Sequence, residues 1–358
     1  MKKLPFLVLL VFLSGPFSKA QSVPTKAALT ALMQKAAVPG MQLVYSRRGV
    51  VSTYNLGLRK AGSPDAVGAT TTFEAASLGK ALLAYVALRL LDRGVLDLDK
   101  PLLTYYAYPR LQASPRAEKI TARMVLGHTS GLPNWAAKPL SPEWRTAPLR
   151  LKFAPDSCWN YSGEGFVFLQ KTLEHLTGKS FEALAQAEIF GPLHLAHSSF
   201  VWQPSFATTA ATGHDDKGQP ITINHFAEGY AAFSLLTTAT DYSRFIQAMM
   251  AGRGLKPATA RLLLTPANEA VRYGTPATAT DPFIAWASGV GLATTSQGLA
   301  QWQWGDNGDF KGLFMTLPGH QESLVILTNS ANGPKMTDDL LHLFFGPGQY
   351  RAMQWLAE

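Results

Sequence analysis

The chain has 358 residues, 47% of them hydrophobic, which is enough to bury a large core in one large domain or two closely packed domains. Its 32 lysine and arginine residues outnumber 24 aspartate and glutamate residues, but they form no run dense enough to indicate a nucleic-acid-binding protein. The single cysteine, Cys158, excludes an intramolecular disulfide and a cysteine-based metal site.

The first 20 residues predict a secretory signal peptide. Lysines at positions 2 and 3 precede an apolar stretch at residues 4–13, and residues 18–20, Ser-Lys-Ala, offer a small-x-small cleavage site. The apolar stretch is shorter than the about 20 residues that span a bilayer, and a retained membrane anchor is the alternative interpretation. We therefore expect a mature chain from about Gln21, with a net charge of +5, no integral membrane span, and a periplasmic or secreted location.

The next segment predicts a helix followed by a β-hairpin. Residues 25–37 have helical periodicity and end at Pro39-Gly40, which is a helix stop signal. Two short runs of apolar and β-branched residues, 42–46 and 50–56, flank a glycine-bearing turn at residues 47–49.

Residues 78–93 predict a buried core helix. The run is rich in leucine and alanine, is interrupted by Arg89, and stops at Gly94. A helix that is apolar on most faces lies in a protein core, and this one is too short for a membrane span.

The middle of the chain, residues 101–250, alternates helical segments with loops rich in proline and glycine. Residues 166–177 and 181–190 predict amphipathic helices. We expect Thr240 and Asp241 to form the N-cap and first turn of another helix that continues to residue 250.

Strand-like segments return near the end of the chain. They are residues 289–294, 300–304, 312–317 and 323–328. A turn at residues 318–321 separates the last two, and residues 336–345 predict a closing helix. Strands at both ends of the chain around a helical middle predict an α+β fold, in which a helical insertion splits one antiparallel sheet.

The segment Ser77-Leu78-Gly79-Lys80 is the only Ser-x-x-Lys in the chain. Residues three apart at a helix N-terminus share a face, so the Lys80 amine can reach the Ser77 hydroxyl. Serine becomes nucleophilic when a base takes its proton, and a lysine with a lowered pKa can be that base. The helix N-terminus would also favour a developing oxyanion. The alternative interpretation is a serine that only caps a core helix.

Residues 73–80, Phe-Glu-Ala-Ala-Ser-Leu-Gly-Lys, resemble the active-serine segment of class C β-lactamases, their esterase relatives and DD-peptidases. Further segments resemble the same superfamily, in the same order along the chain. They are residues 127–132 with His-Thr-Ser-Gly-Leu, 160–163 at its Tyr-x-Asn element, 189–193, 235–242, and 304–308 at its Lys-Thr-Gly or His-x-Gly element. On these motifs, nearly the whole mature chain is similar to the serine β-lactamase and penicillin-binding-protein superfamily.

The resemblance implies a β-lactamase/transpeptidase-like fold with two domains. An α/β sandwich with an antiparallel sheet would comprise residues 21–76 and 283–358, and an all-helical domain would comprise residues 77–282, with the active-site cleft between them. It also implies an exported serine hydrolase that acts on a small-molecule or peptide ester or amide. Such an enzyme needs no metal and no organic cofactor, and its oligomeric state is left open.

The resemblance also assigns roles to individual residues. Ser77 would attack a carbonyl and become acylated, Lys80 would take its proton, and Tyr161 would help carry that proton to the leaving group. The backbone N–H groups of Ser77 and Asp309 would form the oxyanion hole. The substrate-binding residues would be Gly163, Asp306, Asn307 and Gly308.

Two positions depart from the family's pattern. Gly163 stands where many relatives have an asparagine that holds the acyl group and the lysine. Asp306 stands where relatives have a lysine or histidine, which attracts the carboxylate of β-lactams and of peptides ending in D-alanine. At about 4 Å and an effective dielectric near 20, one charge pair is worth roughly 4 kcal/mol. We therefore expect neutral or positively charged esters or amides as substrates, an expectation that an alignment shifted by one residue would remove.

Alternatives to an esterase or amide hydrolase are a DD-peptidase or β-lactamase, and a catalytically silent relative that binds cell wall or peptide. His128 and Ser130 are expected to be turn scaffold, and Cys158 a small buried hydrophobe. His194 and His197 have the spacing of a zinc site, but no third ligand lies nearby in the sequence.

Overall fold

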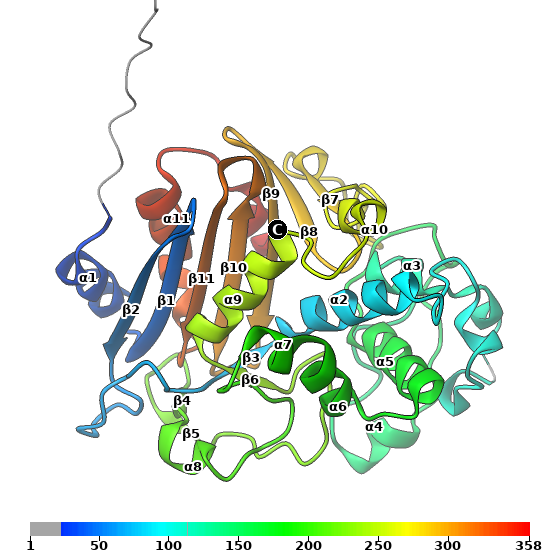
Figure 1. The fold of residues 1–358 in the computed structure, drawn as a ribbon, viewed down its shortest axis with the longest axis horizontal. Helices are drawn as coiled ribbons and strands as arrows, with labels where there is room; N and C mark the ends of the chain where they lie inside the picture. Colours follow the sequence, from blue (N-terminus) through cyan, green and yellow to red (C-terminus); the bar gives the residue numbers. More distant parts are fainter. Residues whose placement is uncertain (1–22, 113) are drawn as a thin grey trace, which may run out of the picture.

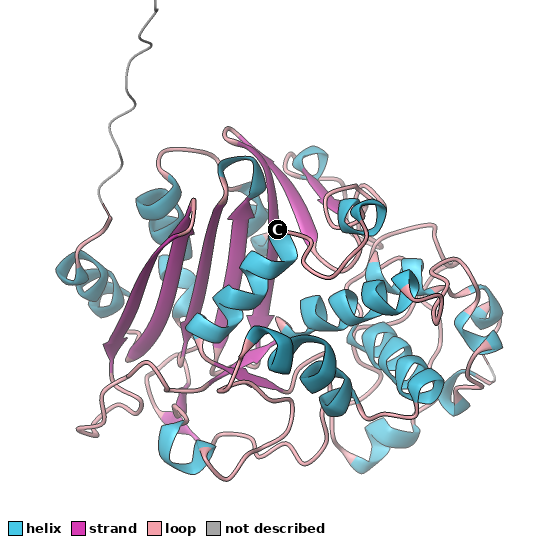
Figure 2. Cartoon of the chain, in the orientation of Figure 1, coloured by secondary structure: helices cyan, strands magenta, loops and turns pink. Residues whose placement is uncertain are grey.

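The computed structural model describes residues 23–112 and 114–358, and the predicted signal peptide lies outside this part of the chain. A seven-stranded antiparallel sheet forms one side of the molecule, and a group of helices around α2 forms the other (Figures 1 and 2). The strand order is β2-β1-β11-β10-β9-β8-β7. The strands are β1 Gly40–Arg47, β2 Val50–Gly57, β7 Ile284–Trp286, β8 Gly291–Thr295, β9 Gly298–Asp306, β10 Lys311–Leu317 and β11 Glu322–Thr328.

The two ends of the chain share this sheet, as the sequence predicts. Strand β1 pairs with β11 from Met41 opposite Thr328 to Arg47 opposite Glu322. The α+β fold with a split antiparallel sheet is therefore confirmed. Strand β7 was not predicted, because its three residues are too few to show a two-residue periodicity.

The predicted hairpin forms with a two-residue turn. Arg47 pairs with Val50, and the turn residues Arg48 and Gly49 have φ angles of 50° and 82°. Positive φ at both central positions is the backbone of a type I′ turn, whose twist matches that of the flanking strands.

Helices cover both faces of the sheet and create two hydrophobic cores. Side chains of β1 alternate between them, with Leu43 in the core beneath α1 and α11, and Val44 in the core that includes α2. Helices α1 (Lys26–Ala36), α11 (Thr337–Phe345) and α12 (Arg351–Ala357) belong to the first core. Helix α9 (Ala239–Met250) packs on β1 and β11 from the other face.

The N-cap of α9 differs from the predicted one. Thr238, in an extended conformation, accepts a hydrogen bond from the Asp241 N–H, whereas Thr240 already lies inside the helix. The prediction therefore placed the N-cap two residues too far along the sequence. A threonine followed three residues later by a first-turn acid fits the Thr238–Asp241 pair better than Thr240–Asp241.

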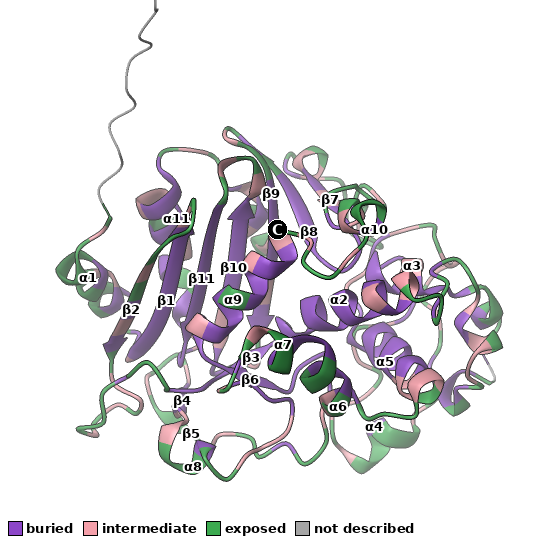
Figure 3. Cartoon of the chain, viewed as in Figure 1, coloured by how far each residue is buried: buried purple, intermediate pink, exposed green. Residues whose placement is uncertain are grey.

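Helix α2 (Gly79–Asp92) is the centre of the helical part, as predicted for a core helix. All of its residues are buried except Arg89, Leu91 and Asp92 (Figure 3). The other α-helices are α3 Ala122–Leu126, α4 Pro142–Thr146, α5 Gly163–Thr177, α6 Phe181–Ala185, α7 Gly191–Leu193, α8 Phe206–Thr209 and α10 Pro257–Arg261. Short 3₁₀ helices occupy Leu102–Thr104, Pro109–Leu111, Ala117–Lys119, Asp281–Phe283, Pro318–His320 and Gly333–Met336.

The segment predicted as one helix at residues 181–190 is divided. It starts as α6 and continues as a π-helical turn, Gln186–Phe190, before α7. Two small sheets complete the fold. They pair β3 (Phe73–Ala76) with β6 (Leu235–Thr237), and β4 (Gly213–His214) with β5 (Pro220–Ile221).

The division into domains at residues 76/77 and 282/283 stays a prediction. Helix α9 lies inside the predicted helical range, yet it contacts strands β1 and β11 of the sheet. Within the described part of the chain, no helix has both the length and the apolar character that crossing a membrane requires.

Candidate active site

Ser77 lies in the turn between β3 and α2. The preceding residue, Ala76, is buried and has a φ of 49°, a left-handed conformation that is unfavourable for a residue with a Cβ. The pairing of β3 with β6 shifts register between Glu74 and Ala76. This local strain turns the chain sharply, so that Ser77 stands just before the first turn of α2.

Lys80 contacts Ser77 inside the protein. Its Nζ lies 2.8 Å from the Ser77 Oγ and 2.8 Å from the carbonyl oxygen of Ala232, and the Ser77 Oγ lies 3.2 Å from the same carbonyl. Lys80 is fully buried, and this desolvation holds the pKa of its amine well below the usual value. The one-turn spacing predicted from the sequence therefore brings an amine with a lowered pKa to the serine hydroxyl.

Tyr161 completes this group of polar atoms. Its hydroxyl accepts a hydrogen bond from Gln303 Nε2 at 3.2 Å and is also hydrogen-bonded to Ser77. The Lys80 Nζ lies 4.8 Å from the centre of its ring. Burial raises the pKa of the Tyr161 phenol, so the phenol keeps its proton at neutral pH.

The His128 ring packs against the Tyr161 ring. The two ring centres are 4.5 Å apart, and His128 Nδ1 accepts a hydrogen bond from the Ser162 N–H at 3.0 Å. Burial holds the pKa of His128 well below its usual value. The imidazole is therefore neutral, with its proton on Nε2, and its position fits the scaffold role expected from the sequence.

Ser77 opens into a cavity of about 450 Å³. Of the predicted site residues, Ser77, Tyr161, Asp306 and Asn307 line it. The remaining walls come from Asn134, Trp135, Lys138, Pro139, Leu140, Asn224, Phe226, Ala232, Phe233 and Trp304. Four predicted site residues, Lys80, Gly163, Gly308 and Asp309, are not part of this lining.

The predicted oxyanion-hole residue Asp309 points elsewhere. Its carboxylate faces β4, where a Cβ on Gly213 would lie 2.0 Å from the Asp309 Oδ2, and it accepts a hydrogen bond from its own N–H. Burial raises the pKa of this carboxyl group. Asp309 thus does not line the cavity of Ser77, and its place in the oxyanion hole stays a prediction that these contacts do not favour.

The end of β9, rather than Asp309, lies beside Ser77. A Cβ on Gly305 would lie 2.3 Å from the Ala75 carbonyl oxygen, so the strand passes directly against the turn that carries Ser77. Asp306 pairs with Lys311, and the Asn307 N–H bonds to the Phe310 carbonyl. Because N–H directions alternate along an antiparallel strand, the Asp306 N–H is directed away from β10.

The charge of Asp306 is compensated, contrary to the expectation of a repelling carboxylate. Lys311 Nζ lies 2.5 Å from the Asp306 Oδ1, which also accepts a hydrogen bond from the Gly308 N–H at 2.8 Å. Gly308 therefore shapes the β9–β10 turn, with a φ of 90°, and does not reach the cavity. Asp306 is half exposed, so this ion pair is screened, but it removes the basis for excluding anionic substrates.

Gly163 does not line the cavity, because Trp135 covers it. Gly163 starts α5, its N–H bonds to the Asn134 Oδ1, and the Trp135 ring occupies the space above it. The structure therefore does not place residue 163 in the cavity lining, and its role in substrate binding stays a prediction. Trp135 lines the cavity at this place.

Glu74 is a further residue that the sequence analysis missed. It is buried, and its carboxylate accepts hydrogen bonds from the side chains of Asn307, at 2.6 Å, and Asn224, at 3.1 and 3.2 Å. Burial raises the pKa of Glu74. Both asparagines line the cavity, so Glu74 fixes how their amides face it. A charged residue inside the apolar segment before Ser77 was the available signal.

Other predicted features have structural explanations. Cys158 is only partly buried, so it is not the buried hydrophobe that we expected. The N–H of His197 bonds to Asp241, and no cluster of three potential metal ligands exists among the described residues.

Comparisons with known proteins give one family. A family model described as Beta-lactamase matches residues 25–344. A β-lactamase of Yersinia enterocolitica is 27% identical over 228 residues, which are 62% of this chain and 58% of that protein. Esterase EstB of Burkholderia gladioli is 29% identical over 185 residues, 46% of each chain. Both matches thus span about half of those proteins.

One further relative is matched along most of its length, and solved structures agree in fold. Penicillin-binding protein 4 of Amycolatopsis lactamdurans is 25% identical over 344 residues, 88% of this chain and 87% of that protein. A class C β-lactamase structure aligns with a TM-score of 0.73 at 21% identity, over 89% of this chain and 92% of that one. The octameric penicillin-binding protein homologue from Pyrococcus abyssi aligns with a TM-score of 0.75 at 18% identity, over 90% of this chain and 76% of that one.

Proposed function

The chain belongs to the β-lactamase family of serine hydrolases, and from this premise we propose that it hydrolyses esters or amides through an acyl-enzyme on Ser77. One observation carries the proposal. The Lys80 Nζ lies 2.8 Å from the Ser77 Oγ at a buried site where desolvation lowers the lysine pKa. A neutral amine at this distance is a base for the serine proton at neutral pH.

The proposed reaction proceeds in two halves. Ser77 Oγ attacks the substrate carbonyl while its proton passes to Lys80, and the oxyanion accepts hydrogen bonds from the N–H groups of Ser77 and Asp306. The proton then moves from Lys80 through the Tyr161 hydroxyl to the departing alcohol or amine, which leaves an ester on Ser77. Water next attacks this ester, gives up a proton to the same groups, and releases the acid with free Ser77.

Uncharged esters and amides are the proposed substrates. The side chain that contacts the Tyr161 hydroxyl from the sheet is the neutral amide of Gln303, so β9 offers no cation beside the catalytic group. The likeness to Esterase EstB supports this choice. A cavity without a fixed cation on the strand gives little attraction to a substrate carboxylate.

Lys138 favours a second candidate function, hydrolysis of β-lactams or of peptides that end in a carboxylate. Its exposed side chain lines the cavity, and the charge of Asp306 is compensated by Lys311. Lys138→Gln would separate the two candidates. It should raise KM several-fold for a penicillin and leave KM for a neutral ester unchanged.

A silent binding relative is disfavoured by the same geometry, because a protein without turnover has no need of a buried lysine beside a serine. Export is part of the proposal and depends on residues 1–20, whose charged start, apolar stretch and small-x-small site are typical of a signal peptide. Expression with and without these residues, followed by fractionation of the cells, tests the location.

The central test is covalent labelling. The purified protein is incubated with a fluorophosphonate and, separately, with a fluorescent penicillin, and its intact mass is measured. We expect an adduct that is absent in Ser77→Ala and unchanged in a control with the exposed Ser205 replaced, Ser205→Ala. An adduct that persists in Ser77→Ala, or no adduct with either reagent and no ester turnover, would refute the proposal.

A further inference from the structure

A second cavity, of about 500 Å³, lies between strands β9 to β11 and the helices α11 and α12. Alternate residues of β9, β10 and β11 form its floor, because side chains alternate between the faces of a strand. Trp304, Leu313 and Ile326 are in register across the three strands. The next row towards the site end of the sheet is Asp306, Lys311 and Thr328.

The walls of this cavity are two helices near the end of the chain. One wall consists of residues 333–334 and the first turn of α11, and the other consists of Met353, Leu356 and Ala357 of α12. The match to the family model ends at residue 344, so α12 lies beyond it. The wall that α12 supplies is therefore a feature of this chain that the family match does not include.

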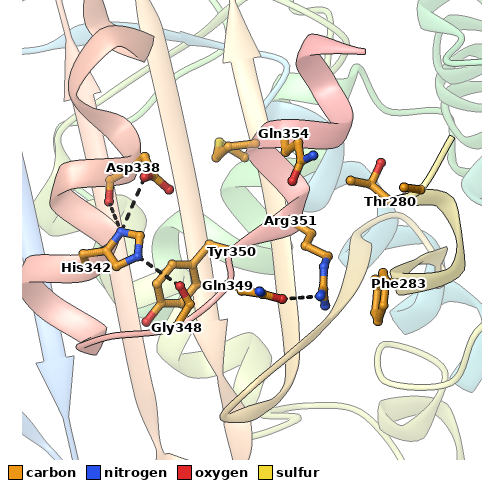
Figure 4. A pocket seen from close by; sticks show the side chains of 11 residues that line it. Thr280, Phe283, Asp338, His342, Gly348, Gln349, Tyr350, Arg351 and Gln354 are labelled. Carbon is orange, nitrogen blue, oxygen red and sulfur yellow. Dashed lines mark hydrogen bonds and ion pairs between the residues drawn. The ribbon is translucent and has the colours of Figure 1, made fainter.

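Helix α12 is held firmly in place. Trp355 is buried, its Nε1 donates a hydrogen bond to Asp281 at 2.7 Å, and its ring lies 4.9 Å from that of Trp159. The connection before α12 is also fixed, because the His342 ring bonds to the Gly348 carbonyl at 3.0 Å, as Figure 4 shows. The cavity wall is thus a packed element, as a binding site requires.

The two cavities meet at Trp304 and Asp306, which line both. The Trp304 ring lies 4.6 Å from the ring of Tyr161. In the proposed reaction, Tyr161 gives the proton to the departing alcohol or amine. The leaving group of the substrate is therefore the part that lies closest to the second cavity.

The lining selects an uncharged apolar group. Trp304, Leu313, Ile326, Met353 and Leu356 supply apolar surface, and the Asp306–Lys311 ion pair compensates its own charges at the rim. The volume falls within the roughly 300–1,000 Å³ of typical ligand pockets. Besides that ion pair, the charged side chain in the lining of this cavity is Asp338, which is exposed.

We propose that the second cavity binds the apolar leaving group of the substrate, so that the enzyme prefers esters and amides of long alkyl or aryl alcohols and amines. This inference rests on the proposed function, because it places the leaving group beside Tyr161. Each methylene buried in the cavity should raise kcat/KM by up to about fourfold.

The test uses acetate esters from ethyl to octyl, which share one acyl-enzyme and differ only in the leaving group. In the unmodified protein, kcat/KM should rise with chain length. Ala357→Trp, at an exposed lining position that tolerates a larger side chain, should lower the ratio of kcat/KM for octyl over ethyl acetate by about tenfold. The matched control is Leu264→Trp, at an exposed leucine outside both cavities, which should leave this ratio unchanged.

A binding measurement without turnover separates the two proposals. Titration calorimetry of 1-octanol with the Ser77→Ala protein should show binding that is weakened in Ser77→Ala with Ala357→Trp. Ester turnover that depends on Ser77 but not on alcohol length would overturn the inference and leave the proposed function standing. Octanol binding without any turnover would refute the proposed function and leave only an apolar binding site standing, and absence of octanol binding would overturn the inference.

Discussion

The indole of Trp135 occupies the space into which a side chain on residue 163 would project. A Cβ on Gly163 would lie 2.3 Å from the Trp135 Cη2, and the neighbouring ring carbons are at 2.5 and 2.7 Å. Trp135 itself packs against Phe233, with ring centres 5.7 Å apart. The glycine and the tryptophan therefore form a matched pair, in which the missing side chain makes room for a wall of the catalytic cavity.

Gly163→Ala should damage both stability and activity. The added methyl group has to displace an aromatic ring that other rings hold in place, and such overpacking costs typically 1–3 kcal/mol. Thermal unfolding should show a lower Tm, and kcat/KM for a neutral ester should fall at least about tenfold as Trp135 moves into the cavity. The double variant Gly163→Ala with Trp135→Ala removes the clash. If it is no more stable than the sum of the two single changes predicts, the packing explanation is wrong.

Gly305 allows β9 to lie directly against the turn that carries Ser77, and Gly305→Ala should separate the two. The new Cβ would lie 2.3 Å from the Ala75 carbonyl oxygen, a backbone atom that cannot rotate away. We expect a loss of about 1–3 kcal/mol in the free energy of unfolding in urea and a large loss of kcat, since the Asp306 N–H moves away from the oxyanion. Gly319→Ala, where a Cβ meets nothing within 4 Å, is the control and should be neutral. Equal effects of the two changes would contradict the argument.

The sequence predicts those parts of the site whose geometry is set locally along the chain, and not those that depend on contacts between distant segments. Ser77 and Lys80 could be placed together because one helical turn fixes their separation, whatever the rest of the fold does. Choosing between the N–H groups of Asp306 and Asp309 for the oxyanion hole required the pairing register of β9 and β10. The two residues are three positions apart at the turn, and no local periodicity in the sequence reveals that register. The Ala232 carbonyl, which contacts both Ser77 and Lys80, comes from the backbone and leaves no signature in the sequence.

The same reasoning applies to the fold. Long elements with a clear period, such as the hairpin of β1 and β2 and the buried helix α2, follow from the amino-acid pattern. Helix α12 was not predicted, because its seven residues cover only two turns and are stabilised by tertiary contacts of Trp355.

Lys80→Met should abolish turnover and stabilise the fold. Burial lowers the pKa of this lysine, so the unfolded chain binds a proton that the folded chain does not. The folded state therefore loses stability at every pH below the usual lysine pKa, about 10.4. Methionine, with a similar length and no charge, should raise the free energy of unfolding at pH 7 by at least about 1 kcal/mol. This gain in the free energy of unfolding should shrink as the pH rises towards 10. Urea unfolding of both proteins at several pH values measures it. A variant that keeps turnover would show that Lys80 is not the base.

The pH dependence of the reaction should reveal the same lysine. If neutral Lys80 accepts the serine proton, kcat/KM for a neutral ester falls on the acid side as the amine becomes protonated. Because the pKa of Lys80 is lowered, this fall should lie well below the range in which an exposed lysine titrates. Rates that rise only near pH 10 would contradict a desolvated base.

His128→Asn should make the stability of the protein less sensitive to acid. The imidazole is buried and its pKa is held well below the usual value, so below about pH 6.5 the unfolded chain binds a proton that the folded chain excludes. Stability therefore falls with decreasing pH through this group, by up to about 1.4 kcal/mol per pH unit. Asparagine suits the position, because it tolerates the φ of 58° and its Oδ1 can accept the Ser162 N–H. The matched control is His194→Asn, at an exposed histidine with a φ of 55°, which should leave the pH dependence unchanged. Urea unfolding between pH 4.5 and 8 distinguishes them, and equal slopes for all three proteins would show that His128 is protonated in the folded state.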